Sequence, residues 1–496
     1  GNRGVAVGYE SLKANTTGSA NIGIGYAALT TNTTGTDNIA IGTLSLDANT
    51  SGASNTAVGT SALSANTTGA SNAALGKGAL QANTTASNNT AVGLDALCAN
   101  TTGSSNTVIG SVALDANTTG QNNTAVGVNA LGSNTTADDN TSVGTASLRC
   151  NSTGTANTAL GKSALFANTT GDQNVAVGAT ALDANTTGCR GVAIGYNALG
   201  ANTDGNFNTA VGRWSLATNT TGDFNVAVGY SSLQNSTTAG GNVAVGIESL
   251  FLTTTGENNS ALGTCSLRAN TTGALNTAIG ECALATNTTA DNNVAVGARA
   301  LKLNTTGESL VAVGRNALEQ NTTGANNTAV GRDALINNTT GANNVAVGYL
   351  SLTANTTGAQ NVAVGQKSMC LNTTGIDNTS FGSDSLQVLT TGSSNTAIGR
   401  SSALAVTTGS NNLLLGHDAG RATSPSGNLT TQSNQVVLGD DNITNLWCAD
   451  TSISSSDLRD KTDIEDFTHG LDFVTKLKPK TYRWDKRSWY VTGDES

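Results

Sequence analysis

The stretch NTAVGTSALSANTTGAS (residues 55–71) is followed directly by NAALGKGALQANTTASN (residues 72–88), and this 17-residue unit continues in register from Gly4 to about Asn428. The unit reads N-T-A-V-G-x-x-A-L-x-A-N-T-T-G-x-x, and we number its positions from the first asparagine. All 25 copies have glycine at position 5, from Gly8 to Gly416. A period that persists for so long without an insertion is typical of a solenoid, in which each coil stacks on the preceding one. The sequence therefore predicts a rod.

Composition and charge exclude several classes of function. Charged residues make up 11% of the chain and the formal net charge is -10. A nucleic-acid partner is not expected, because phosphate binding needs a basic surface. Membrane insertion is not expected either, since no apolar run approaches the length of about 18 residues that a spanning helix needs. The chain begins with Gly1 and is expected to be an internal fragment of a longer protein.

No metal or cofactor site is indicated. The seven cysteines lie at variable repeat positions, without a C-x-x-C pair or a histidine partner. Cys265 and Cys282 lie one period apart, but stacked side chains that point the same way have poor geometry for a disulfide. We expect reduced thiols without a specific role.

Each coil is expected to contain two short strands and two turns. Position 4 is apolar in every copy and position 2 is mostly Val, Ile or Thr, so we expect both to face inward from one strand. The alanine at position 3 would then face outward, forming a flat apolar strip that self-association buries. Leucine at position 9, present in 22 of 25 copies, is expected to form a second inward ladder. The N-T-T-G turn should stack Asn15, Asn32, Asn49 and Asn66 into a hydrogen-bonded column.

These motifs resemble the head repeats of trimeric autotransporter adhesins and, more closely, the N-T-A-V-G and A-L-x-x-N-T-T-G repeats of bacteriophage tail fibres. The resemblance implies an all-β fold, a parallel β-roll or β-solenoid of about 25 coils wound as an intertwined homotrimer. A monomeric β-solenoid remains an alternative, because the sequence does not say which side of the strand meets a partner.

The chain changes character near its C-terminus. We assign residues 1–428 to the repeat shaft, residues 429–455 to a transition segment with one partial repeat, and residues 456–496 to a different module. Apolar residues with helical spacing in the last segment predict a short α-containing module. Its stretches SDLRDK (456–461) and LKPKTYRW (477–484) resemble the intramolecular chaperone auto-processing domain of endosialidases and phage tail spikes.

That resemblance implies a catalytic dyad of Ser456 and Lys461 that cuts the chain once, between Ser455 and Ser456. A desolvated lysine can act as the base that activates a serine hydroxyl. The alternative is that Ser456 caps a helix and Lys461 is a solvated charge. The segment is shorter than the family domain, so truncation and loss of cleavage both remain open. No turnover enzyme is expected.

Exposed aromatic residues could contact a glycan, since aromatic faces stack on sugar rings. The candidates are Tyr196, Phe207, Trp214, Phe224 and Tyr230. The alternative is that these side chains pack at a seam between chains.

The sequence thus predicts a structural fibre, the extracellular tail-fibre shaft of a bacteriophage virion, trimerised by its C-terminal chaperone. Expected partners are further copies of the chain, other virion tail proteins and a host cell-surface receptor, most simply a glycan. The alternatives are a surface fibril or adhesin and a surface fibre of a virus of a eukaryotic host. Glycosylation would favour these, because Asn-x-Ser/Thr sequons recur at Asn15, Asn32, Asn66 and Asn117. A polysaccharide depolymerase is disfavoured, because the unbroken register leaves no inserted loops for a catalytic groove.

Overall fold

The computed structural model describes residues 3–445, which form one parallel β-sheet of 26 strands. It divides into a compact unit, Gly1–Asn442, and a second unit, Ile443–Ser496, most of which lies outside the described residues. Every strand is three residues long and occupies positions 2 to 4 of its repeat. The strands are β1 (Val5–Val7), β2 (Ile22–Ile24), β3 (Ile39–Ile41), β4 (Thr56–Val58), β5 (Ala73–Leu75), β6 (Thr90–Val92), β7 (Thr107–Ile109), β8 (Thr124–Val126), β9 (Thr141–Val143), β10 (Thr158–Leu160), β11 (Val175–Val177), β12 (Val192–Ile194), β13 (Thr209–Val211), β14 (Val226–Val228), β15 (Val243–Val245), β16 (Ser260–Leu262), β17 (Thr277–Ile279), β18 (Val294–Val296), β19 (Val311–Val313), β20 (Thr328–Val330), β21 (Val345–Val347), β22 (Val362–Val364), β23 (Thr379–Phe381), β24 (Thr396–Ile398), β25 (Leu413–Leu415) and β26 (Val436–Leu438).

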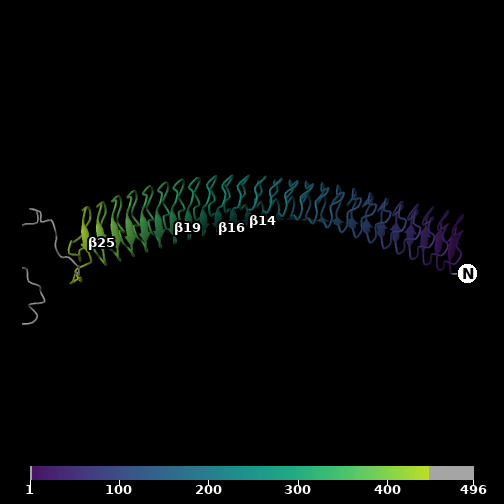
Figure 1. Cartoon of the computed structure of the whole chain (residues 1–496), viewed down its shortest axis with the longest axis horizontal. Coiled ribbons are helices and arrows are strands. Elements are labelled where there is room, and N and C mark those ends of the chain that lie inside the picture. The colour runs from purple at the N-terminus through teal and green to yellow at the C-terminus, as the bar shows by residue number, and fades with distance from the viewer. Residues whose placement is uncertain (1–2, 446–496) are drawn as a thin grey trace, which may run out of the picture. The chain divides into compact units, whose positions relative to one another are not determined.

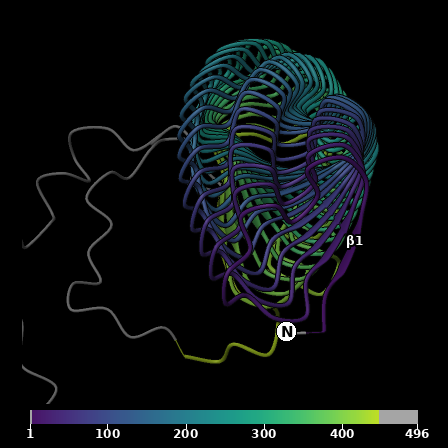
Figure 2. The ribbon, with the colours of Figure 1, turned by 90° about the vertical axis from the view of Figure 1, so that its right-hand side faces the viewer.

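The strands pair parallel, each with those of the coils before and after it, so the predicted solenoid is confirmed (Figure 1). In β13 and β14, for example, Thr209 pairs with Val226 at the 17-residue spacing. The spacing changes once, between Leu413 of β25 and Val436 of β26, which are 23 residues apart. Viewed from the end, successive coils lie behind one another as closed loops of similar outline (Figure 2). The described residues contain no helix, and therefore none that could span a membrane.

The inward face of the strand is opposite to the one expected from the sequence. Ala210 at position 3 of β13 is fully buried, whereas Thr209 and Val211 on either side are only partly buried and point outward. The buried alanine packs in one continuous core with the leucine at position 9 and the small residue at position 8. The apolar strip on the surface is therefore made by positions 2 and 4, not by alanine. The predicted burial of leucine at position 9 is confirmed.

The reason is the narrow interior of the coil, where a small side chain, usually the methyl group of alanine, packs opposite the leucine. In the β25 coil the sizes are exchanged: position 3 is Leu414 and position 9 is Gly420, where a Cβ atom would collide with the Leu414 side chain. Where position 3 is Ser142, position 8 is also a serine, and the two buried hydroxyls of Ser142 and Ser147 bond to each other. Positions 3, 8 and 9 thus behave as one packing unit.

The second strand predicted for each coil does not form. The residues at positions 7 and 9 have left-handed backbones, as in Trp214 and Leu216, with φ of 60° and 51°. Such a conformation costs roughly 1–2 kcal/mol for a residue other than glycine. Burying a leucine side chain returns about 1.5–3 kcal/mol, and the Leu216 N–H donates to Ser232 O of the next coil at 2.9 Å. The left-handed conformation is retained because it buries the leucine side chain and lets the leucine N–H donate a hydrogen bond to the next coil.

The predicted asparagine column at position 12 is confirmed. Asn49 Nδ2 donates to Asn32 Oδ1 of the preceding coil at 2.7 Å and to Gly52 O of its own turn at 2.9 Å. The same bonds recur through most of the solenoid, and these side chains are fully buried from Asn32 onward in nearly every coil. Because buried amides must be paired, each coil depends on its neighbour to satisfy this asparagine.

A second asparagine column, at position 1, was not expected from the sequence. Asn38 Oδ1 accepts the backbone N–H of Asn55 in the next coil at 3.0 Å. Asn38 Nδ2 donates to Gly52 O at 2.9 Å, so this carbonyl oxygen receives amides from both columns. The two columns join the strand to the N-T-T-G turn across the core.

Position 5 requires glycine for two reasons. Its φ lies between 116° and 146° in all copies from Gly8 to Gly416, a region that side chains disfavour. A Cβ atom at Gly212 would also lie against the carbonyl oxygen of Gly229 in the next coil. The glycine therefore allows the coils to stack closely where the strand ends.

The first testable prediction concerns the column at position 12. Replacing Asn185 by alanine removes one of the two amide donors to Gly188 O and takes from Asn168 Oδ1 and Asn202 Nδ2 their partner in the column, at an expected cost of about 1–3 kcal/mol. We expect amide hydrogen exchange to accelerate in the coils around Asn185 and to remain unchanged in distant coils. The control is Thr187→Ala, on the exposed side of the same turn. Equal exchange in the two variants would contradict the structural role of the column.

Candidate functional site

An exposed apolar strip runs along the strands and is formed by the outward side chains at positions 2 and 4. Val7, Leu75, Leu160 and Leu262, all at position 4, are each about half exposed, at 56%, 52%, 48% and 50%. Monomeric soluble proteins rarely expose continuous apolar surface of this extent. Other exposed members of the strip are Val5, Ile24, Ile41, Ile109, Ile194, Val243, Ile279, Val313, Val330, Phe381, Ile398, Leu413, Val436 and Leu438.

Three of the five candidate glycan-contacting residues lie together at the end of the strands, at positions 6 and 7. The rings of Trp214 and Tyr230 are 5.8 Å apart and tilted by 55°. The guanidinium carbon of Arg213 lies 3.9 Å from the Trp214 ring centroid and 5.7 Å from that of Tyr196. Tyr196 and Tyr230 remain 51% and 43% exposed. Arg213 thus joins these aromatic residues into one surface column.

The other two candidates form a separate column at position 17, just before the strands. The rings of Phe207 and Phe224 stack at 5.1 Å, with 8° between their planes. Arg190 lies over the other face of Phe207, at 5.1 Å from the ring centroid. Phe224 is the most exposed of the five, at 62%, and the next coil has Gly241 at this position. Arg190 was missed in the sequence analysis, although its 17-residue spacing from Phe207 identifies it.

The five candidates therefore form two columns rather than a single pocket. We call the position-17 residues Arg190, Phe207 and Phe224 the entry column. We call Tyr196, Arg213, Trp214 and Tyr230 the exit column. Strands β12, β13 and β14 run between the two columns, and no described ring contact joins one column to the other. A ligand stacking on both columns would have to lie across the apolar strip.

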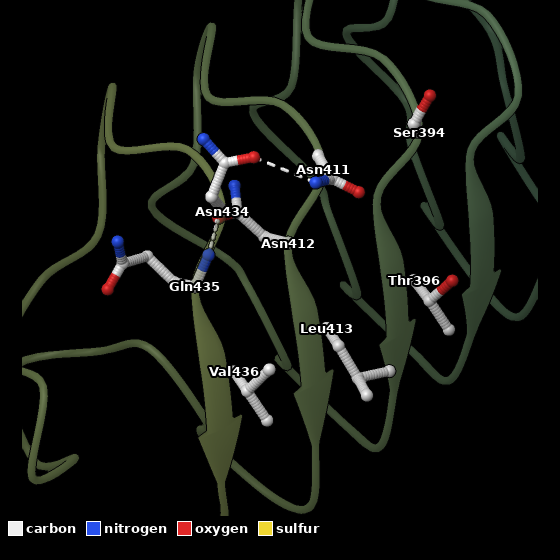
Figure 3. Close-up of a pocket in the computed structure, with 8 residues that line it drawn as sticks. All are labelled: Ser394, Thr396, Asn411, Asn412, Leu413, Asn434, Gln435 and Val436. Carbon is white, nitrogen blue, oxygen red and sulfur yellow. Dashed lines mark hydrogen bonds between the residues drawn. The ribbon is translucent and has the colours of Figure 1, made fainter. Parts of the chain in front are cut away.

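A groove of about 390 Å³ lies on the outward face of β24, β25 and β26 (Figure 3). Several of its amide groups bond to one another: Asn411 Nδ2 donates to Asn434 Oδ1 at 2.7 Å, and Asn412 Oδ1 accepts the Gln435 N–H at 2.9 Å. Leu413 and Val436 line its apolar side. With no charged lining residue, the groove is a continuation of the apolar strip rather than a catalytic site.

The sequons at position 12 are part of the core. Asn32, Asn66 and Asn117 are fully buried, and each Nδ2 atom, the atom that would carry a sugar, is bonded within the asparagine column. A glycan at these residues is incompatible with the folded coil. The sequons are therefore explained as turn chemistry, one of the interpretations that the sequence left open.

Other reactive groups form no centre in the described residues. Among residues 3–445, no cluster of His, Cys, Asp or Glu side chains could hold a metal ion. Six cysteines in this range are free thiols. Burial raises the pKa of the thiols of Cys98 and Cys370, which makes them poor nucleophiles. The expected dyad, Ser456 and Lys461, lies outside the described residues, as does the expected α-containing module.

We expect iodoacetamide near pH 8 to alkylate Cys98 and Cys370 more slowly in the folded protein than in urea. The raised pKa leaves a smaller fraction of each thiol as thiolate in the folded state. Peptide mass spectrometry at successive times measures the two rates. Equal rates in the folded and denatured protein would show that the solenoid does not shield these thiols.

Residues 456–495 match the family model described as the chaperone of endosialidase. This match confirms the resemblance inferred from the SDLRDK and LKPKTYRW stretches. No curated protein and no solved structure matches the chain. A 17-residue-repeat β-solenoid and a segment of the endosialidase chaperone family together fit a tail-fibre-like protein.

Proposed function

We propose that the chain is the shaft of a bacteriophage tail fibre, assembled from three parallel copies and exposed on the virion. The observation that carries this proposal is the apolar strip at positions 2 and 4, which runs from β1 to β26. The C-terminal chaperone segment supports it, because such a segment accompanies fibrous assemblies in the resemblance stated above. The proposed partners are the other copies, neighbouring tail proteins and a host-surface receptor, with a glycan as its simplest chemistry.

Three-fold symmetry suits a strip of this kind. If three copies turn their strands toward a common axis, each apolar position in one coil meets the same level of the other two. Burial returns roughly 25 cal/mol per Å² of apolar surface, and the contribution repeats in every coil along the shaft. Cyclic symmetry also closes the assembly, so that no strip remains to recruit further copies.

The chaperone segment would act before the mature fibre exists. We propose that it holds three C-termini together while the repeats stack, and that Ser456, with Lys461 as base, then attacks the carbonyl carbon of Ser455. The serine oxygen forms an ester as the peptide C–N bond breaks, and water hydrolyses that ester. The reaction occurs once per chain, so the shaft would end at Ser455.

Intact mass under native and denaturing conditions tests assembly and cleavage separately. We expect a native mass of three chains, each ending at Ser455, and three uncut chains for Ser456→Ala. Lys461→Ala should also remain uncut, whereas Lys461→Arg tests whether the lysine must lose its proton. A native monomer would contradict the trimer, and normal cutting of Ser456→Ala would contradict the assigned nucleophile.

A pair of substitutions tests whether the strip is the contact surface. Leu262→Lys with Ile279→Lys places two charges in adjacent coils of the strip, where both wild-type side chains are at least 40% exposed in one chain. In the trimer these charges would be buried without partners, so we expect the melting temperature to fall by several degrees. The matched control is Thr272→Lys with Thr289→Lys, on the exposed turns of the same coils. If both pairs leave the melting temperature unchanged, the strip faces solvent.

A further inference from the structure

We infer that the exit column of one copy contacts the entry column of the next copy, and that this contact, which we call the clasp, fixes the axial register of the shaft. This inference rests on the three-copy assembly proposed above. The need for such a device arises from the repeat itself. Coils that are nearly alike can pair one coil out of step and lose only the contacts at the two ends, so the generic repeat specifies register weakly.

Within one chain the two columns cannot touch. Phe224 precedes β14 and Tyr230 follows it, six residues later, and an extended chain of that length spans roughly 20 Å. The same separation holds for Phe207 and Arg213 around β13, and for Arg190 and Tyr196 around β12. Any contact between the columns must therefore involve a second copy.

Cyclic symmetry brings the columns of different copies together. Interfaces in a three-fold ring are heterologous, so a patch on one copy meets a different patch on the next. When three strands run in the same sense around one axis, the end of each strand approaches the start of its neighbour. The exit column of one copy then meets the entry column of the next at nearly the same height.

The side chains complement each other row by row in this arrangement. At β12, Arg190 meets Tyr196 of the second copy, and at β13 Phe207 meets Arg213 of that copy. Both rows pair a cation with an aromatic face, an attractive contact. At β14, Phe224 meets Tyr230, an aromatic pair. Within each chain, Trp214 packs against Arg213 and Tyr230 and holds the exit column in position.

A shift by one coil spoils this match. In one direction Arg190 would face Arg213 of the second copy, and like charges at an interface act against that pairing. In the other direction Arg190 would face the methyl group of Ala179, so one of the three favourable contacts between the columns would be lost. The columns therefore distinguish the correct register from its nearest alternatives. The surrounding repeats do not make this distinction.

The same pairing recurs at the N-terminal end of the solenoid. Only two coils among the described repeats have arginine at position 17, those of Arg190 and Arg3. The strand after Arg3 also ends at a tyrosine, Tyr9, which is 67% exposed and stacks on Tyr26 at 5.6 Å. Both arginines are thus matched to a tyrosine at the height where a neighbouring copy would present it.

Photo-crosslinking of the full-length protein reads the contact and the register together. Benzoylphenylalanine in place of Phe224 keeps an aromatic ring in the entry column and bonds covalently to whatever C–H group it touches. Trimers mixed from light and ¹⁵N-labelled chains identify products between copies by mass spectrometry. We expect the main inter-chain product at residues 229–231. The control is benzoylphenylalanine at Thr221, on the exposed N-T-T-G turn three residues before Phe224, which should give no inter-chain product.

The outcomes separate this inference from the proposed assembly. A native mass of three chains without an inter-chain product from position 224, or with products one coil away near residues 213 or 247, would overturn the clasp and leave the trimer intact. A product only with an added oligosaccharide would assign the columns to glycan binding instead. A monomeric native mass would overturn both proposals.

A second variant tests the part played by charge. In Arg190→Ala with Arg213→Ala, the penalty against the shifted register disappears. We expect the product from position 224 to spread over sites 17 residues apart, instead of remaining at residues 229–231. An unchanged single product would show that the arginines do not determine register. Both side chains lie on the surface, so the coil itself should fold normally.

Discussion

The narrow interior of the coil is the constraint on which the rest of the structure depends. Opposite the leucine at position 9 the space suits a small side chain, so Ala210 and its equivalents face inward and their larger neighbours face outward. The amides of Asn38 and Asn49, buried in this interior, are paired within the chain. A core this thin cannot stabilise a single coil, and each coil completes its neighbours.

The period, the strand positions and the turn asparagines could be predicted from the sequence, because stacking repeats each local preference in every coil. The inward face of the strand could not be read from apolar character. In a strand of three residues, V-A-V is apolar on both faces, and the larger pair appears to be the better core. The exchange of sizes between Leu414 and Gly420 would have indicated the correct face. Correlated size changes are informative where hydrophobicity is not.

The candidate surface residues were predicted in part for the same reason. Residues 17 apart must stack, so the contact of Phe207 with Phe224 follows from the period. Only the structure shows that β13 and β14 separate this column from Arg213 and Tyr230. The sequence did not indicate a role for Arg190 or Arg213, because a single arginine on a surface is common. In the structure each guanidinium lies over an aromatic ring of the adjacent coil and so becomes part of a column. The chaperone segment could be recognised from its ordered motif, which no periodicity contains.

Repetition and register impose opposite demands on a fibre. Identical coils give length with little sequence information, and they also make every axial shift nearly equal in energy. Chaperoned alignment at one end solves this problem only while the end is held, because a long shaft can still pair wrongly farther along. In the proposed trimer, departures from the repeat that face the other copies would act locally and would persist after removal of the chaperone segment. Their place is therefore within the shaft, as at β12 to β14, where the rows of Arg190, Phe207 and Phe224 differ from every coil around them.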